Sequence, residues 1–371
     1  MELRNKSSLT ILVVVAVMAV FFLLAHPVMM DDGYQYESFT EKLANGVIDF
    51  KSFYGFQGLS FFAVPIYWLT HSHLSIIIAS ALFSLMSIPL AFAIGKRVSD
   101  ALLGGYLGVV LFLLTPYPYV TMMRGFQEAA LLFFILLIMY GALEKKPWTG
   151  LAWGIGAIVK PFSLVLAPLF IRKDMKKIEI WFLTLGICVG IAYGIANYVQ
   201  TGHFVTLAAT GAYHGAFDAN NIPELGKSFA LDWKTWARVP ANLFIATRKI
   251  MVSPFVIVLG IISLWKFKTI PLRKRIIVAI ALNILLVGAI TYAFPKYLLP
   301  MTTLLTFLAI PMIVRYPVLI WLVFLDSLAV FIPIYTYFGH NFWDPVVFWI
   351  PFILAICIYV YAHYNPHASR A

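Results

Sequence analysis

Long apolar stretches, separated by short polar or charged segments, run through almost the whole chain. A helix needs about 20 apolar residues to cross a lipid bilayer, with a range near 17–25. By that measure the pattern predicts ten membrane spans. They cover residues 9–28, 73–95, 101–118, 127–143, 178–199, 250–265, 276–293, 297–314, 317–337 and 346–363. The predicted fold class is therefore an all-α polytopic membrane protein.

The composition agrees with this pattern. Of the 371 residues, 62% are hydrophobic and only 12% are charged, whereas soluble globular proteins have about 25% charged residues. The mean hydropathy is +0.89. These values exclude a soluble enzyme and a soluble nucleic-acid-binding protein. Cys188 and Cys357 each lie within an apolar run, so neither a disulfide framework nor a cysteine-based metal site is predicted.

A further apolar stretch, residues 148–171, is interrupted by Lys160-Pro161. Proline removes a backbone donor and disfavours helix at the residue before it. Basic residues precede the stretch at 145–146 and follow it at 172–177. If both flanks are cytoplasmic, the stretch is a re-entrant pair of short helices with Lys160 near its apex.

The distribution of positive charge predicts the orientation. With the N-terminus in the cytoplasm, the inner segments hold 17 of the 27 Lys and Arg residues, against five acidic residues. The net charge of +11 is thus explained by the predicted orientation of the chain in the membrane. The first span lacks a small-x-small cleavage site and is predicted to be a retained signal anchor. Both termini are then cytoplasmic, and residues 29–72 and 200–249 form the long outer segments.

The chain is predicted to be a single transmembrane domain, 1–371, without a soluble C-terminal domain.

The first outer loop begins with two adjacent acids, Asp31 and Asp32. At the membrane boundary a carboxylate can be partly desolvated, which tunes it as a general base. Alternatively, Asp32 caps a helix that begins near Gly33, with Glu37 and Glu41 solvated on that helix. A turn and an interfacial amphipathic helix over 59–69 are expected to follow.

Three basic residues near the outer face are candidate phosphate ligands. Arg124 can meet an anionic group, or it can pair with Glu128 four residues later on a helix. Lys160 is either functional, as buried membrane lysines usually are, or a snorkelling anchor. Lys296, in the segment Pro295-Lys296-Tyr297-Leu298-Leu299-Pro300, is either a phosphate contact or an interfacial anchor.

Other polar residues are weaker candidates for a functional site. Asp326 lies in mid-span, where it either pairs with a neighbouring helix or serves a pathway. Residues with metal-ligating side chains are scattered over the outer loops, without the spacing of a metal site. They are His203, His214, Asp218, His340 and Asp344. No metal ligand or cofactor is assigned, and a divalent cation stays the open alternative.

The order and spacing of these elements resemble the GT-C superfamily of polyprenyl-phosphate-sugar-dependent glycosyltransferases. The branch that looks most similar contains the protein mannosyltransferases and the aminoarabinose transferases. The resemblance rests on the Asp31-Asp32 pair, the Arg124-x-x-x-Glu128 element, the Gly156-x-x-x-Lys160-Pro161 segment and residues 292–300. It covers about the first 175 residues and returns at 292–300.

This resemblance implies a GT-C-like bundle of about ten spans, with a re-entrant helix pair and juxtamembrane helices in the first outer loop. The family's catalytic base falls on Asp31, with Asp32 where the family usually has Glu. Arg124, Lys160 and Lys296 are the implied ligands of the donor phosphate, and Lys296 replaces the family's Arg. Lysine keeps the charge but loses the bidentate fork. Tyr34, Glu128 and Tyr297 are the implied supporting residues.

The function thus expected is inverting transfer of a sugar from a polyprenyl-phosphate donor to an acceptor hydroxyl on the outer face of a bacterial or archaeal plasma membrane. The acceptor is a glycan, a lipid or a protein, and no nucleic acid is involved. Aromatic residues of the 200–249 segment are expected to form either a sugar-stacking surface or a membrane belt. Two other functions are weighed: a transporter or flippase of lipid-linked saccharides, and a surface-polysaccharide polymerase or ligase.

Overall fold

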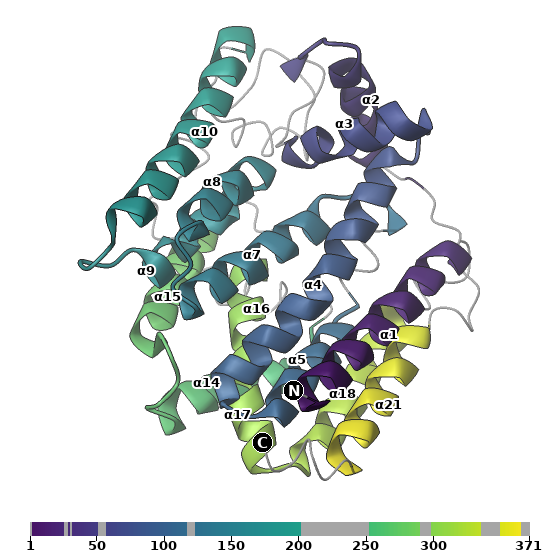
Figure 1. Ribbon diagram of the computed structural model, residues 1–371, viewed down its shortest axis with the longest axis vertical. Helices are drawn as coiled ribbons and strands as arrows, with labels where there is room; N and C mark the ends of the chain where they lie inside the picture. Colours follow the sequence, from purple (N-terminus) through teal and green to yellow (C-terminus); the bar gives the residue numbers. More distant parts are fainter. Residues whose placement is uncertain are drawn as a thin grey trace.

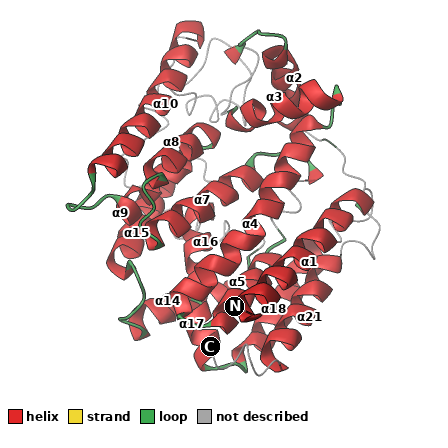
Figure 2. Cartoon of the chain, in the orientation of Figure 1, coloured by secondary structure: helices red, strands yellow, loops and turns green. Residues whose placement is uncertain are grey.

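The computed structural model describes residues 2–25, 29, 32–50, 57–116, 123–201, 252–289, 298–334 and 349–364. Every regular element in these ranges is helical (Figures 1 and 2). In the first half of the chain the helices are α1 (Glu2–Leu24), α2 (Asp32–Ala44), α3 (Gly58–Thr70), α4 (Ser75–Ser99), α5 (Leu102–Leu113), α7 (Glu128–Leu143), α8 (Thr149–Val159), η2 (Pro161–Leu166) and α9 (Ala167–Phe170). The remainder are α10 (Lys177–Thr201), α14 (Pro254–Lys266), α15 (Arg273–Ala289), α16 (Leu299–Leu308), α17 (Ile310–Arg315), α18 (Leu319–Ile334) and α21 (Ile350–Tyr364).

Each of the ten predicted apolar stretches contains a helix. Among the described residues, three helices are long and apolar enough to cross a bilayer: Ser7–Leu24, Ser75–Ser99 and Lys177–Gln200. The other apolar helices are 10–17 residues long. Some ends differ from the prediction; α5, for example, ends at Leu113 rather than near residue 118. An all-helical membrane fold is confirmed, and the number of spans stays a prediction.

Glycines allow several helices to approach closely. A Cβ atom at Gly108 of α5 would collide with the carbonyl oxygen of Ala91 in α4, and one at Gly154 of α8 would collide with Gly186 in α10. Small residues at such crossings bring helix backbones into direct contact, which is a common means of packing in membranes. The α4–α5 hairpin and the α8–α10 pair are held together in this way.

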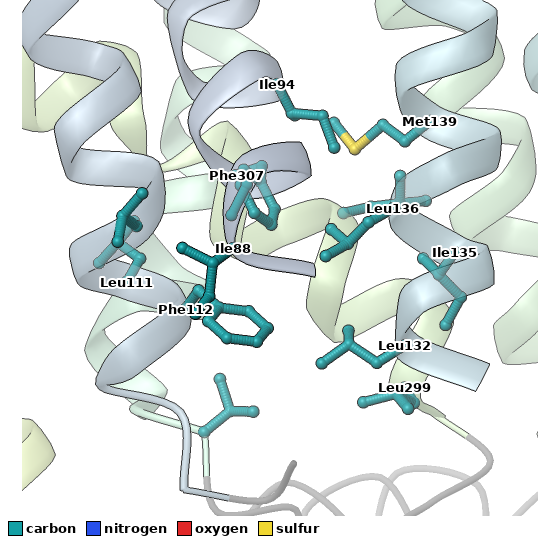
Figure 3. Close-up of a cluster of buried hydrophobic side chains, with 14 of the residues drawn as sticks. Ile88, Ile94, Leu111, Phe112, Leu132, Ile135, Leu136, Met139, Leu299 and Phe307 are labelled. Carbon is teal, nitrogen blue, oxygen red and sulfur yellow. The ribbon is translucent and has the colours of Figure 1, made fainter. Parts of the chain in front are cut away.

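The apolar core lies among α4, α5, α7 and α16, where side chains from the four helices meet (Figure 3). Ile88 of α4, Phe112 of α5, Leu136 of α7 and Phe307 of α16 are each at most 4% exposed. Many residues on the outer helices are apolar and exposed, such as Trp181 (72%) and Trp265 (79%). A buried centre with an apolar periphery is expected when the surrounding solvent is lipid.

The stretch 148–171 is broken where the sequence predicted. Helix α8 ends at Val159, Lys160 is extended (φ −154°, ψ 133°), and Pro161 begins the 3₁₀-helix η2. Its two flanks meet again, because Lys145 and Lys146 line the same small cavity as Arg172 and Met175. The chain thus leaves one end of the bundle, turns at Lys160-Pro161, and returns to that end.

Several basic helix termini lie at the end of the bundle to which this stretch returns. Arg97, in the last turn of α4, pairs with Glu144 after α7 (3.3 Å). Arg275, in the first turn of α15, donates to the carbonyl of Leu169 in α9 (3.2 Å). At the opposite end lie α2, α3 and the C-terminal part of α10 (Figure 1). There Gln200 of α10 accepts a hydrogen bond from the backbone N–H of Phe50 (2.8 Å).

Candidate functional site

The first turn of α2 packs directly on the segment that contains Arg124. A Cβ atom at Gly33 would collide with the carbonyl oxygen of Arg124, so glycine is needed for this approach. After Arg124, the chain turns at Gly125, whose φ of +73° is readily adopted only by glycine. Asp32 is the first residue of α2. The structure thereby brings the backbone of the first turn of α2 against that of Arg124.

The arginine side chain itself is half-buried. Its guanidinium carbon lies 5.6 Å from the ring centroid of Phe126, in a cation–π arrangement. The carbonyl of Phe126 accepts a hydrogen bond from Ser80 Oγ of α4 (3.1 Å). The loop before α7 is therefore fixed to α4 on one side and to α2 on the other.

A hydrogen bond between Tyr36 and Gln127 joins α2 to the start of α7. Gln127 Nε2 donates to the Tyr36 hydroxyl (2.7 Å), and both side chains are buried. The carbonyl of Tyr36 accepts from Ser60 Oγ of α3 (3.0 Å) and from Thr40 Oγ1 (2.8 Å). Sequence reasoning missed Tyr36 and Gln127. The spacing of Gly33, Tyr36 and Thr40 at intervals of three and four was the available signal for a buried helix face.

Two predicted site residues form an ion pair with each other. Lys160 Nζ donates to Glu128 Oε1, and the two residues are 6% and 2% exposed. Glu128 is the first residue of α7, where a carboxylate is also favoured by the helix dipole. The lysine ammonium is buried and paired, which is not the arrangement of a snorkelling anchor. The pair links the break at Lys160-Pro161 to the loop that carries Arg124.

The start of α3 completes this end of the bundle. At Gly58, a Cβ atom would lie 2.5 Å from the Cα of Val159, so α3 begins against the residue before Lys160. The backbone N–H of Gln57 donates to the Tyr193 hydroxyl of α10 (3.1 Å). Five elements (α2, α3, α7, α8 and α10) thus contribute to one polar region, made up of Tyr36, Gln57, Gln127, Glu128, Lys160 and Tyr193 and called the polar centre below.

The interpretation of Glu37 as a solvated side chain is wrong. Glu37 is 4% exposed, and its carboxylate accepts hydrogen bonds from Ser75 Oγ (2.8 Å) and from the backbone N–H of Ile76 (3.0 Å). These groups begin α4, whose first N–H groups have no partner within the helix. Burial raises the pKa of Glu37 above its ordinary value of 4.5, and the bonds from Ile76 and Ser75 oppose that shift.

Beside Glu37, an open groove of about 460 Å³ follows the outward side of α2. Its wall on α2 contains Tyr34, Ser38 and Glu41, and the segment before α4 contributes His73 and Leu74. Tyr34, a predicted supporting residue, is 61% exposed there. Met29, which precedes α2, also lines the groove.

Some predictions fall outside the described residues. These are Asp31, Lys296, Tyr297 and the side chain of Asp32. The same holds for the 200–249 segment from residue 202 on, and for His340 and Asp344. In the part of the chain that the structure describes, no three His, Cys, Asp or Glu side chains gather as they would to hold a metal ion.

Asp326 has a partner in a neighbouring helix, the first of the two predicted alternatives. Its Oδ2 atom accepts from Ser253 Oγ and from the backbone N–H of Phe255 (2.9 Å). Ser253 is the N-cap of α14. The mid-helix acid of α18 therefore satisfies the donors at the start of α14.

Neither a protein-family model nor a curated protein sequence matches the chain. Among solved structures, the chain is similar to ArnT from Cupriavidus metallidurans in the apo state. The two share 13% sequence identity with a TM-score of 0.53, over 97% of this chain and 76% of ArnT. At this identity the likeness shows the fold.

The likeness shows that this chain and ArnT share a fold, and the predicted all-helical architecture is confirmed.

Proposed function

We propose that this chain is an inverting glycosyltransferase, which moves a sugar from a polyprenyl-phosphate donor to an acceptor hydroxyl. One observation carries the proposal. In a GT-C-like fold, the start of α2 packs on the Arg124 carbonyl, and Tyr36 of the same helix is bonded to Gln127, the residue before the Glu128 that pairs with Lys160. These contacts support a site in which an acid at the start of α2 is the base and Arg124 and Lys160 bind the donor phosphate.

In this mechanism Asp31 or Asp32 takes the proton of the acceptor hydroxyl. The hydroxyl oxygen attacks the anomeric carbon of the donor and forms the new glycosidic bond. The bond from that carbon to the phosphate oxygen breaks, and polyprenyl phosphate leaves. A single displacement of this kind inverts the anomeric carbon. General-base assistance contributes about 10²–10⁴-fold.

Positive side chains stabilise the phosphate as it becomes the leaving group. Arg124, whose side chain is half-buried, makes the direct contact, because its fork suits a phosphate. Lys160, which is paired with Glu128, is the second ligand. Lys296 is the third. Tyr34, Glu128 and Tyr297 support these groups.

The proposed orientation places α2, α3 and the polar centre at the outer face of a bacterial or archaeal plasma membrane. Both termini are then cytoplasmic. The meeting of basic helix ends at the opposite end of the bundle supports this orientation, because cytoplasmic loops are enriched in Lys and Arg. In this arrangement residues 148–171 are a re-entrant pair, and the donor's apolar tail lies among lipid-facing helices.

The test uses the purified full-length chain with a panel of radiolabelled polyprenyl-phosphate sugars and a cell-envelope extract as the source of acceptor. The proposal predicts release of polyprenyl phosphate and transfer of label to the extract. Intact donor that crosses proteoliposome membranes would instead support a flippase. Consumption of polyprenyl-diphosphate oligosaccharides alone would support a polymerase or ligase. Either result would overturn the proposal.

A further inference from the structure

The groove along α2 has the dimensions of a ligand site. Its volume of about 460 Å³ falls within the roughly 300–1,000 Å³ of small-molecule pockets. It is bounded by α2 on one side and by the segment that connects α3 to α4 on the other. Neither Arg124 nor Lys160 lines it.

The side chains in the groove suit a sugar ring. Tyr34, Ser38 and Glu41 follow one another at intervals of four and three, so they share one side of the helix. Tyr34 presents an exposed aromatic ring and Ser38 an exposed hydroxyl. Glu41 and His73 add groups that exchange hydrogen bonds with hydroxyls. An aromatic surface beside several hydroxyl-binding groups matches the amphipathic faces of a saccharide.

The charge of the groove restricts this saccharide further. Glu37 and Glu41 line it, while the nearby cation on α2, Lys42, pairs outside it with Asp49 (2.8 Å). The groove is therefore an acidic feature in a chain of net charge +11. A phosphorylated ligand is repelled there, since like charges in close proximity raise each other's energy. An uncharged or amino sugar is accepted.

The groove is lined by residues that flank the proposed base in the sequence. Met29 and Tyr34, which line it, are on either side of the Asp31-Asp32 pair in the sequence. The bundle-facing side of the same helix turn contacts Arg124 through Gly33. The first turn of α2 therefore lies between the Arg124 backbone on one side and the acidic groove on the other.

We infer that the groove lined by Tyr34, Ser38, Glu41 and His73 is the acceptor subsite, and that it takes an uncharged or amino sugar rather than a phosphorylated one. This inference rests on the proposed function, because it identifies the acceptor for the same reaction. The donor phosphate binds on the other side of the α2 turn, and the acceptor hydroxyl reaches the acids from the groove.

Saccharide binding without donor tests the inference directly. The probes are methyl β-glucoside, glucosamine and glucose 6-phosphate at millimolar concentrations, measured by saturation-transfer NMR on the detergent-solubilised full chain. Ser38→Trp fills the groove from an exposed position and is expected to weaken binding of the first two sugars at least 10-fold. Leu69→Trp, at a site on α3 that is 85% exposed and outside the groove, is the matched control.

The expected order for the wild type is glucosamine and methyl glucoside well above glucose 6-phosphate. Three results would overturn the inference: no binding by the wild type, equal binding of the phosphorylated sugar, or binding by Ser38→Trp equal to that of the control. Thermal unfolding of both tryptophan variants at the wild-type temperature checks that they fold. Saccharide binding that depends on Ser38, in a chain that transfers no sugar, would contradict only the proposed function.

Discussion

Lys160, the residue that follows α8, forms an ion pair with Glu128, the first residue of α7, inside the bundle. The two residues are 32 positions apart in the sequence. Their pairing fixes the apex of the broken stretch 148–171 beside the loop that carries Arg124. Through Gln127 and Tyr36 the same loop is bonded to α2. The helix break and the acidic first loop are thus parts of one connected structure.

Breaking this pair is expected to destabilise the protein strongly. Removing one partner of a buried ion pair costs about 3–5 kcal/mol, because the other charge stays buried. We expect Lys160→Met and Glu128→Met each to lower the thermal unfolding temperature in detergent, and the double variant to recover most of the loss. The double variant should still be inactive, since it lacks a phosphate ligand.

The pair of Arg97 and Glu144 is the matched control. It has side chains that are 53% and 34% exposed, and exposed pairs contribute about 0–1 kcal/mol. Arg97→Met should therefore change the unfolding temperature little. Single Lys160 and Glu128 variants as stable as Arg97→Met would contradict the structural role assigned to the buried pair.

The contact of Gly33 with Arg124 is expected to control the rate of transfer. Gly33→Ala forces the first turn of α2 away from the Arg124 carbonyl, and a displacement of about 1 Å in an active site can lower the rate 10²-fold. A fall in kcat of about 10- to 100-fold is expected. Gly190→Ala in α10, where the added Cβ meets no described residue beyond its own stretch of helix within 4 Å, should keep the wild-type kcat. Equal kcat values for both variants would argue against this contact.

Glu37 is expected to make stability depend on pH. Because burial raises its pKa in the folded protein above 4.5, the folded state binds the proton more tightly than the unfolded state. Its contribution to stability is then fully present below pH 4.5 and is lost as the pH rises through the folded-state pKa. Glu37→Gln cannot titrate but keeps an oxygen to accept the bond from Ile76.

The measurement is the difference in unfolding temperature, wild type minus Glu37→Gln, followed upward from pH 4. The difference should become smaller or more negative as the pH rises. A difference that is constant, or that grows with pH, would mean that the folded protein does not hold this carboxyl at a raised pKa.

The return of residues 148–171 to their starting end predicts a labelling pattern. Cys188 and Cys357 are both exposed, so they are first replaced by alanine. In that background Lys146→Cys and Lys173→Cys should react with a membrane-impermeant maleimide only after cells are permeabilised. Asn45→Cys, at the exposed end of α2, should react in intact cells. Labelling of positions 146 and 173 from opposite sides would show that the stretch crosses the membrane.

The apolar pattern predicted the helices well because burial in lipid demands long uncharged runs. Every predicted stretch contains a helix, and Pro161 breaks the one that it interrupts, through its missing backbone donor. Helix ends were less predictable. The close crossings at Gly108 and Gly154 depend on partner helices that a single sequence does not identify.

The site was predictable as a set of residues and less so as a set of contacts. The sequence placed Glu128 beside Arg124, four residues away, whereas the bond to Lys160 depends on how α7 and α8 pack. In one of the two alternatives for the first loop, Glu37 was a solvated side chain on the helix that Asp32 caps. Its burial follows from the donors at the start of α4, which lie 38 and 39 residues away.

The proposed function requires an acid at the start of α2 to act as the base in sugar transfer. The most direct measurement compares transfer from a radiolabelled polyprenyl-phosphate sugar by the wild type, Asp31→Asn, Asp32→Asn and Asp100→Asn. Asp100 lies in the left-handed turn between α4 and α5 (φ 55°), where asparagine is well tolerated. We predict that Asp31→Asn or Asp32→Asn lowers transfer by about 10²–10⁴-fold, while Asp100→Asn transfers as the wild type does. Wild-type transfer by both first-loop variants and by their double variant would contradict the account.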